Sequence, residues 1–418
     1  MTFSSLGLSP PLVRAVAELH YDAPTPVQQT AIPAVLRGGD VWAQAQTGSG
    51  KTAAFVLPLL ERLGRRPASS PRPVRALLLV PTRELAAQVL EAIGRYGVHL
   101  PRPLKACLAV GGVSANPQMM ALRGGADLVV ATPGRALDLA AQNALRLDAV
   151  ETLVLDEADR LFSLGFAEEL ARLLALLPAR RQSLLFSATF PPAVQALAEQ
   201  LLYEPTRIRV EPGEAAAAPP ILQRTLAVDA ERRTMLLRHL LQTEPWSHVL
   251  VFVASRYGAD HVTLKLQRAG FAAAALHGEL SQTARTQALE DFKAKRVRVL
   301  VATDVAARGL DIAQLPAVVN YDLPRSPVDY LHRIGRTGRA GEPGTALSFV
   351  SADTEAHMRL IEKRHRLSLP REQLPGFEPT ETAAPVLDPQ GGVKGKRKSK
   401  KDKLREAAAA AAARKPSR

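Results

Sequence analysis

A short segment in the N-terminal half of the chain has residue types and spacing that suit the binding of a phosphate group. It follows the strand-like residues 40–43 and contains two glycines, which allow backbone N–H groups to approach a phosphate closely. The lysine that follows can reach the β- and γ-phosphates of a nucleotide, and the next residue, a threonine, can hold Mg²⁺. The strict pattern begins with glycine, where this chain has alanine. The segment predicts a nucleotide site formed by Ala45, Gln46, Thr47, Gly48, Ser49, Gly50, Lys51 and Thr52.

An acidic segment, Asp-Glu-Ala-Asp at residues 156–159, directly follows the strand-like residues 153–155. Acids at the carboxyl end of a buried strand point into the crevice where open α/β sheets bind their ligands. Asp156 can hold Mg²⁺ through water, and Glu157 can orient or deprotonate an attacking water molecule. The alternative is an acidic turn that caps the following helix.

Two arginines in the C-terminal half, Arg336 and Arg339, are three residues apart and would project from one face of a helix. A planar guanidinium can clamp a γ-phosphate and stabilise the charge of its transition state. Isolated arginines are more often surface ion pairs, but Gly335 and Gly338 favour a close approach to a ligand. Because the phosphate segment and the arginines lie in different halves, we expect a catalytic site that is complete only when two domains close.

The elements that must position these residues alternate along the chain as short apolar runs and longer helical stretches. Continuous apolar runs bounded by turn signals indicate strands buried on both faces, and their alternation with helices predicts parallel sheets. A Pro-, Gly- and Ala-rich stretch interrupts the pattern, which divides the chain into two α/β domains of about 200 and 150 residues. The predicted strands are residues 76–80, 128–131, 152–155 and 183–186 in the first domain, and 249–253, 273–276, 297–301 and 318–321 in the second.

Composition places the chain among ordinary globular proteins of the cytoplasm. It has 418 residues, of which 46% are hydrophobic and 22% charged, and it contains no apolar run of the length that crosses a membrane. The N-terminus lacks the features of a secretory signal. The only cysteine, Cys107, excludes an internal disulfide and fits a reducing compartment, with the thiol as a small core side chain.

The positive charge of the chain is concentrated at its C-terminal end. Residues 391–418 hold eleven Lys or Arg and two acids, so they carry +9 of the total charge of +14. Five prolines between residues 370 and 389 forbid a long helix, and we expect the Lys-rich stretch to be disordered. Such a tail suits a polyanion such as RNA, although a tail that only improves solubility would have the same composition.

Taken together, these motifs resemble those of DEAD-box ATP-dependent RNA helicases over about residues 1–365, in the order of that family. Residues 276–286, with Leu-His-Gly and Ala-Arg-Thr, are most similar to the bacterial RhlE-like branch. The resemblance implies two RecA-like domains in tandem. The expected division is a Q-motif region (1–29), an ATP-binding domain (30–210), a linker (211–222), a C-terminal helicase domain (223–370) and a tail (371–418).

The resemblance also implies roles for further residues. Gln28 would read the edge of the adenine ring and Tyr21 would stack on it, with Phe3 as the upstream aromatic, which favours ATP over GTP. Gly309 and Asp311 match positions that meet the nucleotide and its ribose, while Arg336 and Arg339 match the arginine fingers. Ser187 and Thr189 match a motif that couples the nucleotide state to unwinding. The expected RNA contacts are Arg83, Gly112, Thr132, Arg135, Gln282, Arg285 and Thr303.

The predicted function is ATP-dependent, local and non-processive unwinding of RNA by a cytoplasmic monomer that uses ATP and Mg²⁺. Contacts to phosphate and sugar would position RNA without reading its sequence, and the 2′-hydroxyl would distinguish it from DNA. An RNA chaperone or an ATP-locked clamp is the alternative. The acidic box and the Q motif argue against a processive DNA translocase. Ribosome assembly, cold-stress remodelling and mRNA turnover, with their protein partners, all stay open.

Overall fold

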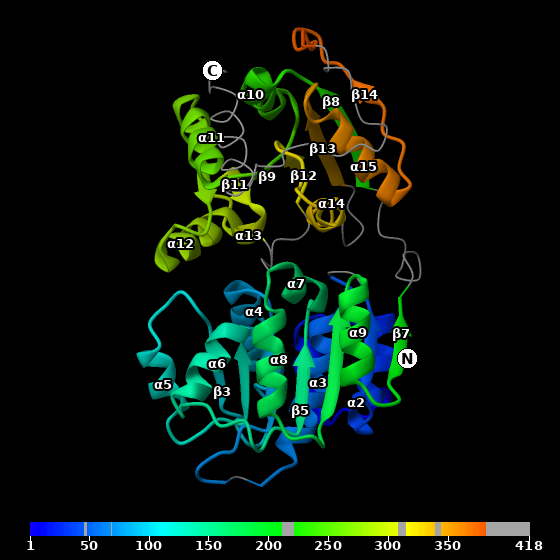
Figure 1. The fold of residues 1–418 in the computed structure, drawn as a ribbon, viewed down its shortest axis with the longest axis vertical. Helices are drawn as coiled ribbons and strands as arrows, with labels where there is room; N and C mark the ends of the chain where they lie inside the picture. Colours follow the sequence, from blue (N-terminus) through cyan, green and yellow to red (C-terminus); the bar gives the residue numbers. More distant parts are fainter. Residues whose placement is uncertain (46–47, 68, 211–220, 308–314, 339–343, 382–418) are drawn as a thin grey trace, which may run out of the picture.

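The computed structural model describes residues 1–45, 48–67, 69–210, 221–307, 315–338 and 344–381. These residues form two lobes that lie one above the other along the long axis, each with a twisted sheet between helices (Figure 1). Each sheet has seven strands, and the strand pairs described in both are parallel. The predicted α/β class with two parallel-sheet domains in tandem is confirmed, while the Lys-rich tail lies outside the described residues.

The first sheet has the strand order β3-β4-β2-β5-β6-β1-β7. Its strands separate two apolar clusters, because successive side chains point to opposite faces. Val154 and Phe186 lie in one cluster, whereas Leu153 and Leu185 lie in the other. The strands are β1 (Val41–Gln44), β2 (Ala76–Leu79), β3 (Ala106–Ala109), β4 (Leu128–Ala131), β5 (Thr152–Leu155), β6 (Gln182–Ser187) and β7 (Thr206–Arg209).

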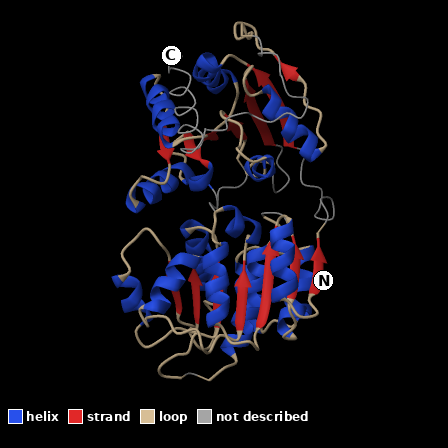
Figure 2. Ribbon diagram, viewed as in Figure 1, coloured by secondary structure: helices blue, strands red, loops and turns tan. Residues whose placement is uncertain are grey.

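The helices of the first lobe cover both faces of this sheet, as Figure 2 shows. They are the 3₁₀ helix η1 (Ser4–Leu6) and the α-helices α1 (Pro10–Glu18), α2 (Pro26–Leu36), α3 (Lys51–Gly64), α4 (Arg83–Tyr96), α5 (Asn116–Leu122), α6 (Pro133–Ala141), α7 (Ala158–Ser163), α8 (Ala167–Leu176) and α9 (Pro192–Leu201). Cys107 is buried on β3, as expected of a small apolar side chain.

The second sheet has the order β10-β11-β9-β12-β13-β8-β14. Its strands are β8 (Ile221–Ala227), β9 (Val249–Val253), β10 (Ala273–Leu276), β11 (Val299–Thr303), β12 (Ala317–Asn320), β13 (Gly344–Val350) and β14 (Arg371–Glu372). Its helices are η2 (Ala230–Arg232), α10 (Arg233–Thr243), α11 (Arg256–Arg268), α12 (Gln282–Lys293), α13 (Asp304–Ala307), α14 (Pro327–Ile334) and α15 (Glu355–His365). In the part of the chain that the structure describes, no helix is both long and apolar enough to cross a membrane.

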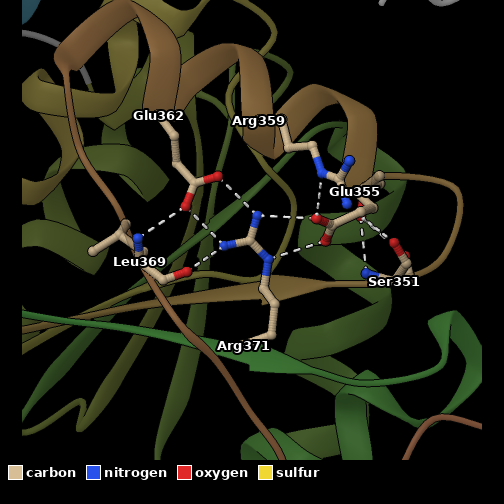
Figure 3. A network of polar contacts seen from close by, with 7 residues as sticks. Ser351, Glu355, Arg359, Glu362, Leu369 and Arg371 are labelled. Carbon is tan, nitrogen blue, oxygen red and sulfur yellow. Dashed lines mark hydrogen bonds and ion pairs between the residues drawn. The ribbon is translucent and has the colours of Figure 1, made fainter.

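The structure differs from the expected domain boundaries at both ends of the second lobe. Strand β8 begins at Ile221, within the expected linker, and residues 371–381 pack on the lobe instead of starting a tail. Arg371 on β14 forms ion pairs of 3.0 and 2.9 Å with Glu355 and Glu362 of α15 (Figure 3). Prolines excluded a helix here, but they did not exclude a short edge strand held by ion pairs.

Candidate active site between the two lobes

The phosphate-binding segment lies between the end of β1 and the start of α3, at the sheet edge that faces the second lobe. Gly50 has φ +90° and precedes Lys51, the first residue of α3. The positive φ favours glycine at this position, and a Cβ on Gly50 would also come within 2.4 Å of the Gln28 side-chain amide. Lys51 is 6% exposed, and its Nζ donates a hydrogen bond of 2.9 Å to the Ala45 carbonyl. Gln46 and Thr47 lie outside the described residues.

Gln28 connects the predicted adenine-binding region to the phosphate segment. Its Oε1 accepts from the Thr25 backbone N–H at 3.0 Å, and its Nε2 donates to the Gly50 carbonyl at 3.1 Å. Tyr21 is partly exposed, and its hydroxyl lies 3.2 Å from that of Tyr96, a neighbour that the sequence did not reveal. Phe3 is only 4% exposed and packs at 6.5 Å from the Tyr21 ring. Phe3 therefore supports the Tyr21 ring from the core, where the Phe3 side chain is buried.

Asp156 and Glu157 follow β5 at the same edge of the first sheet. Asp156 is buried, and its Oδ1 accepts from the Glu157 backbone N–H at 2.9 Å. Burial raises the pKa of the Asp156 carboxyl, while the nearby ammonium of Lys51 opposes that change. Thr52 follows Lys51 in the first turn of α3. A buried carboxylate and a hydroxyl at one sheet edge are oxygen ligands of the kind that Mg²⁺ prefers, so the residues present fit this ion.

The acidic segment is joined to Ser187 and Thr189 by a network of hydrogen bonds. The Asp159 carboxylate accepts from the backbone N–H and the hydroxyl of Thr189, at 3.0 and 2.6 Å. The Asp159 N–H donates to the Ser187 hydroxyl at 3.1 Å, and that hydroxyl donates to the Thr189 carbonyl at 2.7 Å. A displacement of the acidic segment would therefore move the end of β6 with it.

The second lobe places His332 and Arg336 opposite Glu157 and Arg160 of the first lobe. A small cavity between the lobes is lined by Arg160 of α7 and by residues of the second lobe that include His332 and Arg336. Arg160 is buried, and its Nη1 lies 3.2 Å from Glu157 Oε2. Burial, together with Arg160, lowers the pKa of His332 to about 3, so this imidazole is neutral. The sequence had not identified Arg160 or His332 as part of the site.

The segment with the two predicted arginine fingers is less helical than expected. Helix α14 ends at Ile334, so Arg336 lies beyond it and the expected shared helical face is wrong. Gly335 ends the helix, since glycine gives up more conformational freedom in a helix than other residues do. Arg336 is nevertheless buried at the cleft. Arg339, Gly309 and Asp311 lie outside the described residues.

The predicted RNA contacts of the first lobe lie together where β3 and β4 end. Arg83, the first residue of α4, donates a hydrogen bond of 3.2 Å to the Gly112 carbonyl. Gly112 has φ +73°, and a Cβ there would come within 2.6 Å of Arg83 Nη1. The Thr132 hydroxyl accepts from the Gly111 N–H at 3.2 Å, and Arg135 Nη2 donates to the Val113 carbonyl at 2.7 Å. These hydrogen bonds bring residues of separate sequence segments together, with Thr132 and Arg135 buried among them.

The predicted RNA contacts of the second lobe lie at the edge that faces the first. Gln282 begins α12, Arg285 follows in the same turn, and Thr303 ends β11. The Arg285 Nη2 lies 2.5 Å from Oε1 of Glu84 on α4, and both side chains are buried. This ion pair joins the two lobes. It occupies the guanidinium that was expected to bind an RNA phosphate, and the sequence did not reveal it.

Two RecA-like lobes, with a phosphate segment on one and buried arginines on the other, define a nucleotide-driven helicase. Residues 25–197 match the DEAD/DEAH box helicase model, and residues 232–341 match the helicase conserved C-terminal domain. The chain is 40% identical over 377 residues to the DEAD-box ATP-dependent RNA helicase CshA of Bacillus cereus, covering 90% of this chain and 70% of that one. It is 42% identical over 381 residues to the ATP-dependent RNA helicase DeaD of Mycobacterium tuberculosis, covering 91% and 66%.

A solved structure agrees with these relatives. S. cerevisiae Dbp5 bound to RNA and ADP BeF3 superposes with a TM-score of 0.79 at 32% identity, covering 89% of this chain and 95% of that one. The chain belongs to the DEAD-box ATP-dependent RNA helicases. It is an ATP-hydrolysing enzyme that acts on RNA, as predicted.

Proposed function

We propose that ATP binds between the lobes and that its hydrolysis resets a closed, RNA-bound form. The observation that carries this proposal is the division of the candidate site, with Lys51 and Glu157 on the first lobe and Arg336 on the second. A ligand shifts a two-state equilibrium only if it prefers one state. Phosphates that contact both lobes would prefer the closed form, and so would RNA that contacts both lobes.

Each residue of the candidate site has a proposed part in hydrolysis. Gln28 and Tyr21 hold the adenine, and Lys51 exchanges its bond to the Ala45 carbonyl for the phosphates of ATP. Glu157 orients or deprotonates the attacking water, and Arg336, with Arg339, stabilises the charge that develops on the γ-phosphate. Thr52 and Asp156 would hold Mg²⁺, which when bound neutralises phosphate charge. The remaining nucleotide contacts proposed are Ala45, Gln46, Thr47, Gly48, Ser49, Gly50, Gly309 and Asp311.

The link from hydrolysis to RNA is proposed to run through Asp159. Its carboxylate holds Thr189, so a change at Glu157 two residues earlier would be transmitted to the end of β6. The RNA strand would contact both lobes through sugar and phosphate, at Arg83, Gly112, Thr132, Arg135, Gln282, Arg285 and Thr303. A strand held in this way loses a few base pairs locally and is released after hydrolysis.

Four finer assignments extend this proposal: the oligomeric state, the location, the branch of the family and the RNA target. We infer a monomer, because both lobes of one chain supply residues to the proposed site. We also infer that it acts in the cytoplasm, because its single cysteine fits a reducing compartment. The RhlE-like branch rests on residues 276–286, whereas the relatives above are named CshA and DeaD. RNA of the ribosome or of mRNA turnover, with the associated proteins, is the proposed target.

Two assays test the proposal. The rate of ATP hydrolysis is measured with single-stranded RNA and with DNA of the same sequence, and strand separation is measured on a short and a long RNA duplex. We expect stimulation by RNA alone and separation of the short duplex alone. Equal stimulation by DNA would contradict the assignment, and hydrolysis without any strand separation would favour an ATP-locked clamp.

A further inference from the structure

An exposed aromatic pair lies at the start of α11 in the second lobe. Aromatic residues make up only 5% of the chain, and one of them, Tyr257, is 76% exposed. Its ring stacks on that of His261, one turn later in the helix, at 5.5 Å between centroids and 15° between planes. Two parallel rings on one helix face form a flat platform, with the outer face of Tyr257 open to solvent.

The platform lies at the sheet edge that carries the proposed RNA contacts. Strand β9 ends at Val253, which is paired with Thr303 at the end of β11. Tyr257 follows Val253 by four residues, so their Cα atoms are at most about 14 Å apart. The side chain before it, Arg256, pairs with Glu279 in the connection from β10 to α12, whose first residue is Gln282. Helices α11 and α12 lie on the same side of the second lobe in Figure 1.

The position of Tyr257 in α11 is fixed by the backbone. The Ser255 hydroxyl caps the helix by accepting from the Gly258 N–H at 3.0 Å. Ala259 and Val262, on the opposite face of α11, are buried in the core of the lobe. Packing of the opposite face of α11 therefore directs Tyr257 outward, and its ring lies against that of His261.

We propose that Tyr257, supported by His261, stacks on one base of the bound RNA, next to the nucleotides whose phosphates contact Thr303 and Gln282. The inference rests on the proposed RNA contacts of the second lobe. Those contacts hold sugar and phosphate and leave the bases unrestrained. Every base has a π-face, so stacking on tyrosine adds affinity with little dependence on sequence. An exposed tyrosine could also bind a protein, but its neighbours at this edge point to RNA.

The experiment uses the full chain, ADP–BeF₃ and a single-stranded oligouridine, with binding followed by fluorescence anisotropy. A series of strands carries one abasic nucleotide, moved by one position at a time. For the wild type, one position should lower the affinity about tenfold, within the usual range for removal of a base–aromatic stack. Tyr257→Ala should bind the intact strand about tenfold more weakly and show no further weakening at that position. Tyr257→Phe should behave as the wild type.

Two controls separate this inference from the function on which it rests. Tyr203→Ala removes another exposed tyrosine, on the first lobe, and should leave binding unchanged. Gln282→Ala should weaken intact and abasic strands equally. If Gln282→Ala has this effect while Tyr257→Ala binds as the wild type, or weakens binding equally for all strands, the stacking inference is wrong and the RNA path stands. Unchanged binding by Gln282→Ala would instead contradict the proposed path.

Discussion

Replacing Glu157 by glutamine removes one charge and changes the shape of the side chain very little. Glu157 lies at the C-terminal end of β5, beside Asp156, and it is buried. An amide cannot accept the proton of an attacking water as a carboxylate does. The loss of a general base costs about 10²- to 10⁴-fold in rate, which corresponds to about 3 to 5 kcal/mol of barrier.

The structure also limits what else this substitution can change. The Glu157 Oε2 is 3.2 Å from the buried guanidinium of Arg160, and among the described residues that guanidinium has no hydrogen-bond partner. Removal of the carboxylate therefore takes away the counter-ion that the described residues supply to this buried cation. Breaking a buried pair outright costs about 3 to 5 kcal/mol, but the glutamine oxygen can still accept, so we expect folding to become less favourable by about 1 to 3 kcal/mol.

Three measurements distinguish these effects. Single-turnover hydrolysis at saturating RNA should fall by at least about 10²-fold, whereas equilibrium binding of an ATP analogue should stay near the wild-type value. Urea unfolding reports the stability cost. Glu168→Gln, the same substitution at an exposed position of α8, should alter none of the three. Wild-type turnover by the Glu157 variant would refute its assignment as the base.

Three further predictions concern the lobes and the tail. Arg336→Ala and Arg339→Ala should each lower the rate of ATP hydrolysis by about 10³-fold, because a planar guanidinium stabilises the transition state. Lysine should rescue this loss poorly, since it lacks the planar group. A near-normal ATPase rate at saturating RNA would argue against a site shared by the two lobes. Glu84→Gln should tighten RNA binding at low salt, because the carboxylate competes with phosphate for Arg285; weaker binding in an anisotropy titration would mean that the ion pair supports closure. Deleting residues 391–418 should raise the RNA concentration that half-stimulates ATP hydrolysis, without changing the rate at saturating RNA. It should also flatten the salt dependence of RNA affinity, by about 0.7 in slope for each RNA phosphate that the tail neutralises. Identical salt slopes for the full-length and truncated proteins would mean that the tail only improves solubility.

Continuous apolar runs were the strands that the sequence predicted most reliably, whereas β3, β7 and β14 were not predicted. The runs at residues 128–131 and 152–155 coincide with β4 and β5, whose side chains are buried on both faces of the sheet. Strands β3 and β7 have alternating or partial burial, since they lie at the edges, and β14 has two charged residues. These edge strands are defined by their neighbours in the sheet and not by a pattern of their own.

The sequence by itself determined which chemistry to predict for the site, because that prediction depends on residue types at short spacing. A glycine-lysine-threonine segment and an Asp-Glu pair after buried strands were sufficient to predict a phosphate site with a water-activating carboxylate. The tertiary structure alone decided which distant side chains meet them. Glu84 and Arg285 lie in different halves of the chain, as do Arg160 and His332, yet each pair meets where the lobes face each other. No local pattern encodes such a contact, since it arises only when the two lobes come together.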